Sequence, residues 1–138
     1  MQQIINTSHK ASRFHLDKRL DNKIVSRIFK SWVQNFFQNK RGDYMIVSKI
    51  KNKINGFLLL IKEKKENKVR IDLIVVNKNK KNQGIGKSMI EFAKHNFFKK
   101  FKFIVVGTHI DNVGAVKFYK KLGFRKVSQK MVFHFLKK

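Results

Sequence analysis

Residues 74–90, IVVNKNKKNQGIGKSMI, join an apolar segment to a glycine-containing loop and then to a second segment with periodic apolar residues. The first three residues are all apolar, which predicts the end of a strand buried on both faces. After Gly84, apolar residues recur at steps of three and four, which predicts a helix over about 85–98. A helix start presents unpaired backbone N–H groups and the positive end of the helix dipole. This strand, loop and helix therefore suit a bound phosphate group.

The loop carries residue types that favour a phosphate. Gly84 and Gly86 lack a Cβ atom, so the backbone there can come close to a pyrophosphate. Lys81 and Lys87 place positive charge on both sides of the glycines, and Ser88 adds a hydroxyl group. A tight turn without a ligand is the alternative interpretation of such a glycine pair.

Two known nucleotide-binding motifs share parts of this loop. A dinucleotide-binding fingerprint needs a third glycine, but the residue three positions after Gly86 is Met89. A P-loop needs a glycine five positions before Gly86, but that residue is Lys81. The spacing therefore excludes both motifs.

The composition describes one folded domain with a large positive charge. The chain has 138 residues, 42% of them hydrophobic, and a formal net charge of +25. Such an excess attracts polyanions, but the lysines are spread along the chain and accompany many Asn, Ile and Phe residues, as AT-rich genomes tend to produce. We therefore do not expect nucleic-acid binding to be the main role. The positive potential should help a phosphate-bearing ligand to reach the protein.

The absence of cysteine excludes disulfides, a thiolate nucleophile and a cysteine-based zinc site, and we expect no metal. The first ten residues have no secretory signal pattern, and no apolar run approaches the roughly 20 residues of a membrane span. We expect a cytoplasmic protein with no membrane partner, and we leave a homodimer open.

The periodicity of the remaining sequence predicts an alternation of helices and strands. Asp21 offers an N-cap for the first long helix, and Gly123 stops the last one. A short strand could include Ile4 and Ile5. From residue 22 onward, the predicted elements are a helix at about 22–38, strands at 44–50, 54–61 and 68–76, a helix at 85–98, a strand at 101–106, a helix at 113–122, and closing strands at 124–127 and 131–136.

The strand predicted at 68–76 alternates between apolar and polar residues before its apolar end at 74–76. Val69, Ile71 and Leu73 would form its apolar face, and Arg70 and Asp72 would lie together on its polar face. A mixed sheet with helices on its faces follows from the order of the elements, which is typical of an α/β or α+β single domain.

The segment Lys81-Asn82-Gln83-Gly84-Ile85-Gly86 resembles the phosphate loop of the GNAT superfamily of N-acetyltransferases. That signature is a basic residue or Gln, two residues, Gly, any residue, then Gly or Ala; Lys81 departs mildly from the usual Arg or Gln. Residues 112–124, NVGAVKFYKKLGF, resemble the second signature of the family, and the two motifs stand in the family's order. The resemblance covers about residues 43–136.

The resemblance implies a single domain over residues 1–138, with a mixed, mostly antiparallel sheet whose central parallel strand pair splays apart. It also implies that acetyl-CoA is the cofactor. Its pantetheine arm would bond the backbone of the third predicted strand like an added strand, and its pyrophosphate would bind the loop. The implied cofactor-binding residues are Ile74, Val76, Lys81, Asn82, Gln83, Gly84, Ile85, Gly86, Lys87, Ser88, Asn112 and Tyr119.

Tyr119 is the candidate general acid. Acyl transfer from a thioester to an amine expels a thiolate, which a nearby phenol can protonate. The alternative is that Tyr119 only packs beside Phe118.

The general base is less defined, because many relatives place a Glu where this chain has Arg70 or Gly107. Asp72 and His109 are candidates, since a histidine ordinarily titrates near neutral pH, and an ordered water chain is a third. Asp72 could instead be only an ion-pair partner of Arg70, and His109 only a surface residue.

The acceptor is predicted to be a small-molecule primary amine. Ser12-Arg13-Phe14-His15-Leu16-Asp17, Ile71–Val76 and Gly107-Thr108-His109 resemble acetyltransferases that act on nucleotide-linked amino sugars. Such a sugar is our preferred acceptor. The alternatives are acetylation of a protein N-terminus, such as that of a ribosomal protein, and a basic nucleic-acid-binding module on the same fold.

Overall fold

The computed structural model describes residues 21–131 of the chain. The segments Ile4–Ile5 and Ser12–Asp17, and the predicted closing strand beyond residue 131, lie outside the described residues. The elements are α3 (Asn22–Phe37), β1 (Tyr44–Ile50), β2 (Lys53–Glu63), the 3-10 turn η1 (Lys64–Glu66), β3 (Lys68–Val76), the 3-10 turn η2 (Lys78–Lys80), α4 (Ile85–Phe97), β4 (Phe103–Val106) and α5 (Val113–Lys121).

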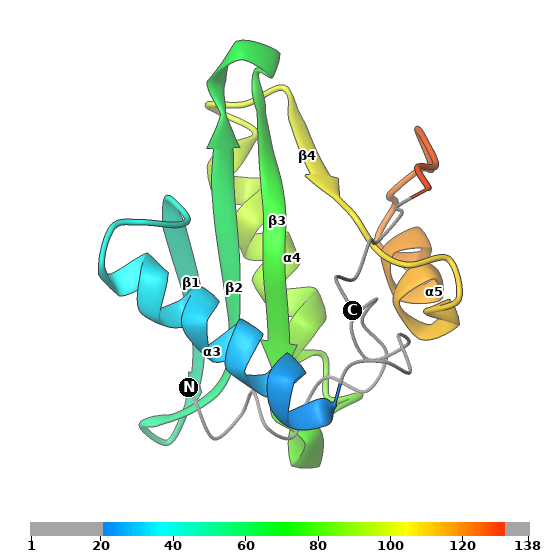
Figure 1. Cartoon of the computed structure of the whole chain (residues 1–138). Coiled ribbons are helices and arrows are strands. Elements are labelled where there is room, and N and C mark those ends of the chain that lie inside the picture. Colours follow the sequence, from blue (N-terminus) through cyan, green and yellow to red (C-terminus); the bar gives the residue numbers. More distant parts are fainter. Residues whose placement is uncertain (1–20, 132–138) are drawn as a thin grey trace, which may run out of the picture.

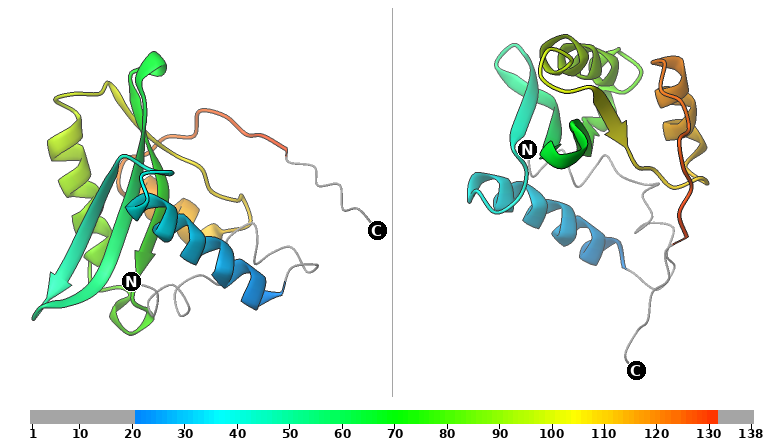
Figure 2. Two further views of the ribbon diagram at one scale, coloured as in Figure 1. Left: turned by 60° about the vertical axis from the view of Figure 1, so that its left-hand side comes forward. Right: turned by 90° about the horizontal axis from the view of Figure 1, so that it is seen from above.

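Within residues 21–131, four strands form one mixed sheet in the order β1-β2-β3-β4. The β1–β2 and β2–β3 pairs are antiparallel, and the β3–β4 pair is parallel. Helix α3 lies across one face of the sheet and α4 across the other (Figures 1 and 2). The predicted mixed sheet with helices on both faces is confirmed. Among the described helices, none is long and apolar enough to span a bilayer.

Helix α3 packs one stripe of side chains on the sheet. The carboxylate of Asp21 caps its start by accepting the N–H of Lys23 at 3.2 Å. Val25, Phe29 and Val33 follow at steps of four and are buried. The sheet residues of this core layer are Phe57, Leu59, Leu73 and Val75.

Helix α4 covers the opposite face and approaches the sheet very closely at Gly56 of β2. A Cβ atom at Gly56 would lie 2.9 Å from the carbonyl oxygen of Val75, 3.0 Å from Cγ2 of Ile85 and 3.1 Å from Cε of Met89. The first turn of α4 therefore rests on the backbone of β2, and only glycine leaves room for it. The close contact of α4 with the sheet in turn fixes the position of the loop that precedes the helix.

Replacing Gly56 with Ala is expected to lower the free energy of unfolding by about 1–3 kcal/mol, because the new methyl group overpacks this contact. Gly107→Ala is the control, since a Cβ atom there would meet no described atom within 4 Å, and we expect it to change stability by less than about 0.5 kcal/mol. Urea unfolding of the two variants measures the difference. Equal stability of the two variants would contradict the close contact.

A β-bulge interrupts β3 at Asp72. Leu60 of β2 pairs with Ile71, and the preceding residue Leu59 pairs with Leu73, so Asp72 is the extra residue between two register positions. The bulge reverses the side chains that follow it: Ile71 belongs to the α4 core layer, whereas Leu73 belongs to the α3 layer. The prediction of one continuous apolar face through Val69, Ile71 and Leu73 is therefore wrong.

Strand β3 extends beyond the end of its pairing with the parallel strand β4. The β3–β4 ladder ends where Ile71 pairs with Val106. Beyond this pair, β3 continues to Val76, while the chain after β4 turns away toward α5 (Figure 1). This confirms the predicted parallel strand pair, β3 and β4, with β4 at the edge of the described sheet. The two-sided burial predicted for residues 74–76 is also confirmed, because Val75 lies in the α3 core layer and its two neighbours pack on the α4 layer.

The predicted strand at 124–127 is absent, because residues 124–131 pair with no strand in the described part of the chain. Val127 is 87% exposed and Met131 79% exposed. Their β-forming residue types indicate a strand, but a strand also needs a partner for its backbone N–H and C=O groups.

Candidate functional site

The chain passes from β3 through η2 into an open helix start. Asn82 and Gly84 adopt left-handed backbone conformations with φ of 61° and 76°. Among the described residues, no side chain caps α4. Ser88 is the first residue of the turn to donate its N–H, to the carbonyl of Gly84 at 2.8 Å. The N–H groups of residues 85–87 thus lack an intrahelical acceptor, so this helix start suits an anion.

The two glycines of the loop have different surroundings. Gly84 has a positive φ, which favours glycine, and a Cβ atom there would meet no described atom within 4 Å. A Cβ atom at Gly86 would lie 3.1 Å from Cζ of Phe118 and 3.7 Å from Cγ2 of Val76. Gly86 therefore lets α5 pack against the start of α4, while the space beside Gly84 is open.

Most side chains of the loop are exposed. These are the side chains of Lys81, Asn82, Gln83 and Lys87. The hydroxyl of Ser88 donates to the carbonyl of Ile85 at 2.9 Å, so its proton is used by the helix itself. The side chain of Ile85 is buried in the core, so only its backbone N–H is open to a ligand. Residues 73–90 contain no acidic residue, so the charged side chains of this segment of the sequence are all lysines.

The edge of β3 toward β4 is open from residue 72 to residue 76 in the described residues. Just past the strand, the N–H of Asn77 donates to the carbonyl of Asn55 on the β2 side at 2.8 Å. Successive residues of a strand present their backbone polar groups to alternate edges. Ile74 and Val76 therefore present theirs to the open edge, which leads directly to the loop before α4.

Asn112 begins helix α5. Its Oδ1 accepts the N–H of Ala115 at 3.1 Å and so caps the helix. The oxygen is thus occupied, and the Nδ2 group carries two protons that can be donated to a ligand.

Tyr119 lies on α5 with only 7% of its surface exposed. Its ring contacts Phe118 and Phe124, with centroids 5.3 Å and 5.5 Å away. Within the described residues its hydroxyl has no hydrogen-bond partner. Burial raises the pKa of Tyr119 to about 12, so the phenol keeps its proton at neutral pH.

The raised pKa of Tyr119 predicts a pH dependence of stability. An unfolded tyrosine ionises near pH 10, whereas the folded phenol ionises near 12, so stability is lost as the pH rises from 10 to 12, by about 1.4 kcal/mol per pH unit. Tyr119→Phe should lack this loss. Urea unfolding at pH 9 and pH 11 measures it, and parallel losses in wild type and variant would contradict the raised pKa.

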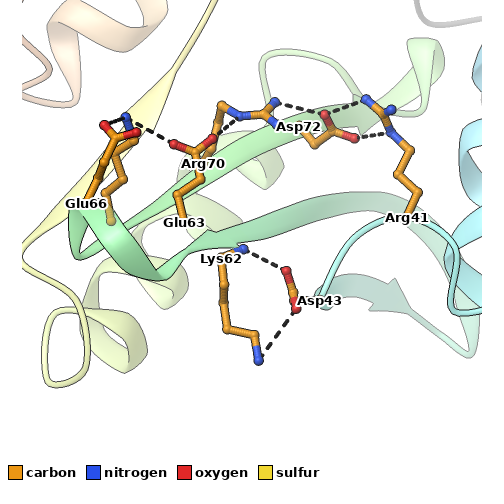
Figure 3. A network of polar contacts seen from close by, with 8 residues as sticks. Arg41, Asp43, Lys62, Glu63, Glu66, Arg70 and Asp72 are labelled. Atoms are coloured by element: carbon orange, nitrogen blue, oxygen red, sulfur yellow. Dashed lines mark hydrogen bonds and ion pairs between the residues drawn. The ribbon is translucent and has the colours of Figure 1, made fainter.

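Asp72 lies at the centre of an ion-pair network (Figure 3). Its side chain is 2% exposed, and its carboxylate accepts Nε and Nη2 of Arg41 at 2.7 and 2.8 Å and Nη1 of Arg70 at 3.0 Å. Arg70 in turn donates Nε to Glu63 at 2.7 Å. The predicted contact between Arg70 and Asp72 is therefore present.

The network shifts the pKa of its half-buried members Glu63 and Arg70. Hydrogen bonds from Arg70 and then Lys68 lower the pKa of Glu63. Burial by itself would lower the pKa of Arg70, but its bonds to the two carboxylates outweigh burial and raise it. Lys68 also pairs with Glu66. Each charge of this network is therefore held by an opposite charge.

His109 lies in the exposed loop between β4 and α5. Its Nδ1 is 3.3 Å from the N–H of Asp111 and 3.4 Å from the carboxylate of the same residue. Gly107, in the same loop, is exposed as well. The position of His109 is compatible with a surface role and with a base that a substrate approaches.

The structure joins the two sequence motifs and separates Asp72 from them. Gly86 of the first motif meets Phe118 of the second, and Tyr119 shares the α4 core layer with Ile85. Asp72 instead contacts Arg41, which follows α3. The sequence did not indicate the structural roles of Gly56, Phe118 and Arg41. Only Gly56 carried a signal, because it is an isolated glycine inside a strand pattern.

An open strand edge that leads into an uncapped helix start suits an extended cofactor whose arm continues into a pyrophosphate, as the pantetheine arm of acyl-CoA does. The family model described as an acetyltransferase (GNAT) domain matches residues 7–137. The chain belongs to this family, a class of acetyl-CoA-dependent N-acyltransferases. No curated protein matches the chain significantly.

Several solved structures are similar to the chain. A putative streptothricin acetyltransferase from Bacillus anthracis, in complex with acetyl coenzyme A, is 34% identical over 62% of this chain, with a TM-score of 0.56. This chain spans about half of that relative, 48% of its length. A Pyrococcus horikoshii protein (23% identity, 94% of this chain and 84% of that chain, TM-score 0.69) and a metagenomic aminoglycoside acetyltransferase with sisomicin (21%, 86% and 75%, 0.60) share the fold.

Proposed function

We propose that the chain transfers the acetyl group of acetyl-CoA to a primary amine of a small molecule, and that residues 1–138 form one N-acetyltransferase domain. The observation that carries the proposal is the continuity of the open β3 edge with the uncapped start of α4. The pantetheine arm would bond the backbone of Ile74 and Val76 as an added strand. The pyrophosphate would then reach the N–H groups of residues 85–87.

The side chains around this path fit the same cofactor. Lys81 and Lys87 would add positive charge beside the pyrophosphate, and Asn82, Gln83 and Ser88 would line it. The free Nδ2 group of Asn112 would donate to the cofactor. The open space beside Gly84 leaves room for the phosphates, and this favours a ligand over a ligand-free turn.

Tyr119 would supply the proton that the departing thiolate needs. A phenol with a pKa of about 12 stays protonated at neutral pH, and its hydroxyl has no other described partner. Its ring also packs beside Phe118, so one residue would serve both as a packing residue and as the acid.

The base stays a prediction with three candidates: Asp72, His109 and an ordered water. The geometry favours the latter two, because the carboxylate of Asp72 already accepts three hydrogen bonds from guanidinium groups. His109 is exposed at the end of β4, where an acceptor amine could reach it.

A nucleotide-linked amino sugar is the acceptor we prefer, on the resemblance of the Ser12–Asp17, Ile71–Val76 and Gly107–His109 segments. The similar folds include acetyltransferases named for streptothricin and for aminoglycosides, and these names support a small-molecule acceptor. A cytoplasmic location and a homodimer stay predictions.

A thiol-release assay with acetyl-CoA tests the proposal. The panel holds nucleotide amino sugars, polyamines, aminoglycosides, peptides with free N-termini and a no-acceptor control. We expect the fastest release with a nucleotide amino sugar. Release only with peptides would support N-terminal protein acetylation instead. No release above the control, together with salt-sensitive DNA binding, would support the nucleic-acid-binding alternative.

A further inference from the structure

We infer that Asp72 is a positioning residue that braces the β-bulge where β3 and β4 separate, and thereby holds the open edge of β3 in place for the pantetheine arm. The inference rests on the proposed function for its consequence, acetyl-CoA affinity. The brace itself is a property of the fold, and it can be tested without any ligand.

The contacts of Asp72 bring three elements together. Arg41 holds the carboxylate with two nitrogens, at 2.7 and 2.8 Å, and its guanidinium lies 4.0 Å from the ring centroid of Trp32 on α3. Arg70 of β3 reaches the same carboxylate and also Glu63 at the end of β2. One buried carboxylate thus links the segment after α3, the bulge and, through Arg70, the end of β2 (Figure 3).

Asp72 lies at the position where a change in the β2–β3 register would most affect the open edge of β3. Asp72 follows Ile71, the last residue of β3 that pairs with β4. If the bulge relaxed into regular pairing, every later residue of β3 would shift by one position. The backbone groups of Ile74 and Val76 would then turn from the open edge toward β2. A fixed bulge therefore decides which backbone groups meet the cofactor.

The same contacts separate positioning from base catalysis. A general base needs a free lone pair within hydrogen-bond reach of the amine. Both carboxylate oxygens of Asp72 face guanidinium groups, and its side chain is 2% exposed. Asp72 consequently acts through the backbone of β3 and not on the acceptor amine.

The test compares Asp72→Asn and Arg41→Lys with the control Glu63→Gln, which removes the other carboxylate partner of Arg70 but leaves the bulge contact intact. Hydrogen exchange of the backbone amides of residues 71–76 and 103–106 is followed by NMR in the absence of ligand. Acetyl-CoA affinity is measured by calorimetry, at a temperature where circular dichroism shows each variant folded. Arg41→Lys keeps the positive charge but loses the bidentate contact with Asp72. It therefore provides the test of the brace if Asp72→Asn does not fold.

We expect Asp72→Asn and Arg41→Lys to speed exchange about tenfold at the amides of Leu73 and Val75, which face β2, without affecting β1. Both variants should also weaken acetyl-CoA binding about tenfold. Glu63→Gln should change either quantity less than about twofold. Unchanged exchange in both variants, or equal effects of Glu63→Gln, would overturn the brace. Faster exchange in the two variants, together with no acetyl-CoA binding by the wild-type protein, would uphold the brace and overturn the proposed function.

Discussion

Tyr119→Phe is expected to lower kcat for thiol release about 100-fold or more, because a positioned general acid contributes at least that factor. Acetyl-CoA affinity should stay nearly unchanged, since the ring and its packing on Phe118 and Phe124 are kept. Loss of a buried hydroxyl without a described partner should not destabilise the fold. Steady-state thiol release with the best acceptor of the panel, together with calorimetry of acetyl-CoA, gives the two quantities.

Tyr44→Phe is the matched control, because Tyr44 is the second of the two tyrosines of the chain. Its ring packs on Phe97 with a centroid distance of 4.7 Å, under the C-terminal end of α4 and away from the loop. The control should retain full turnover. Full turnover in Tyr119→Phe as well would remove Tyr119 as the acid and leave it a packing residue.

Gly84→Ala is expected to weaken acetyl-CoA binding about 10- to 100-fold, the cost of one or two charge-assisted hydrogen bonds to the pyrophosphate. The new methyl group would project into the open space beside the helix start, where the phosphates would lie. Calorimetric titration of the folded variant measures the loss.

Gly123→Ala is the control for the backbone strain that an alanine causes at a position with a positive φ. Gly123 also has a positive φ, 86°, and a Cβ atom there would meet no described atom within 4 Å. Both substitutions should therefore strain the backbone to a similar degree, but only Gly84→Ala changes the proposed site. Equal affinities of the two variants would reject the assignment of this loop to the pyrophosphate.

The parts of the fold that repeat locally could be predicted from the sequence. The periodic residues Val25, Phe29 and Val33 indicated α3, and apolar spacing after Gly84 indicated α4. The parallel pair and the loop between β3 and α4 followed from the resemblance of two short motifs. The two helices depend on neighbours along the chain, so the sequence shows them directly. The parallel pair joins distant residues, so only the resemblance implied it.

The features that depend on distant contacts could not be predicted. Val69, Ile71 and Leu73 alternate in the sequence as they would in an unbroken strand, so nothing in the pattern reveals a bulge at Asp72. Arg41 and Asp72 are 31 positions apart, and their pairing exists only because α3 crosses the sheet beside the bulge. The sequence indicates Arg70 as a partner of Asp72, but its second guanidinium partner, Arg41, is visible only in the fold.

The central claim is that the pantetheine arm of acetyl-CoA lies along the open edge of β3 and that its pyrophosphate binds at the start of α4. Titration of the protein with acetyl-CoA, followed by backbone amide NMR, tests this most directly. The account predicts that the largest saturable shifts occur at Ile74, Val76 and residues 84–88, with small shifts on α3. Shifts that spread over the lysine-rich surface, fade with added salt and leave these amides unchanged would contradict it.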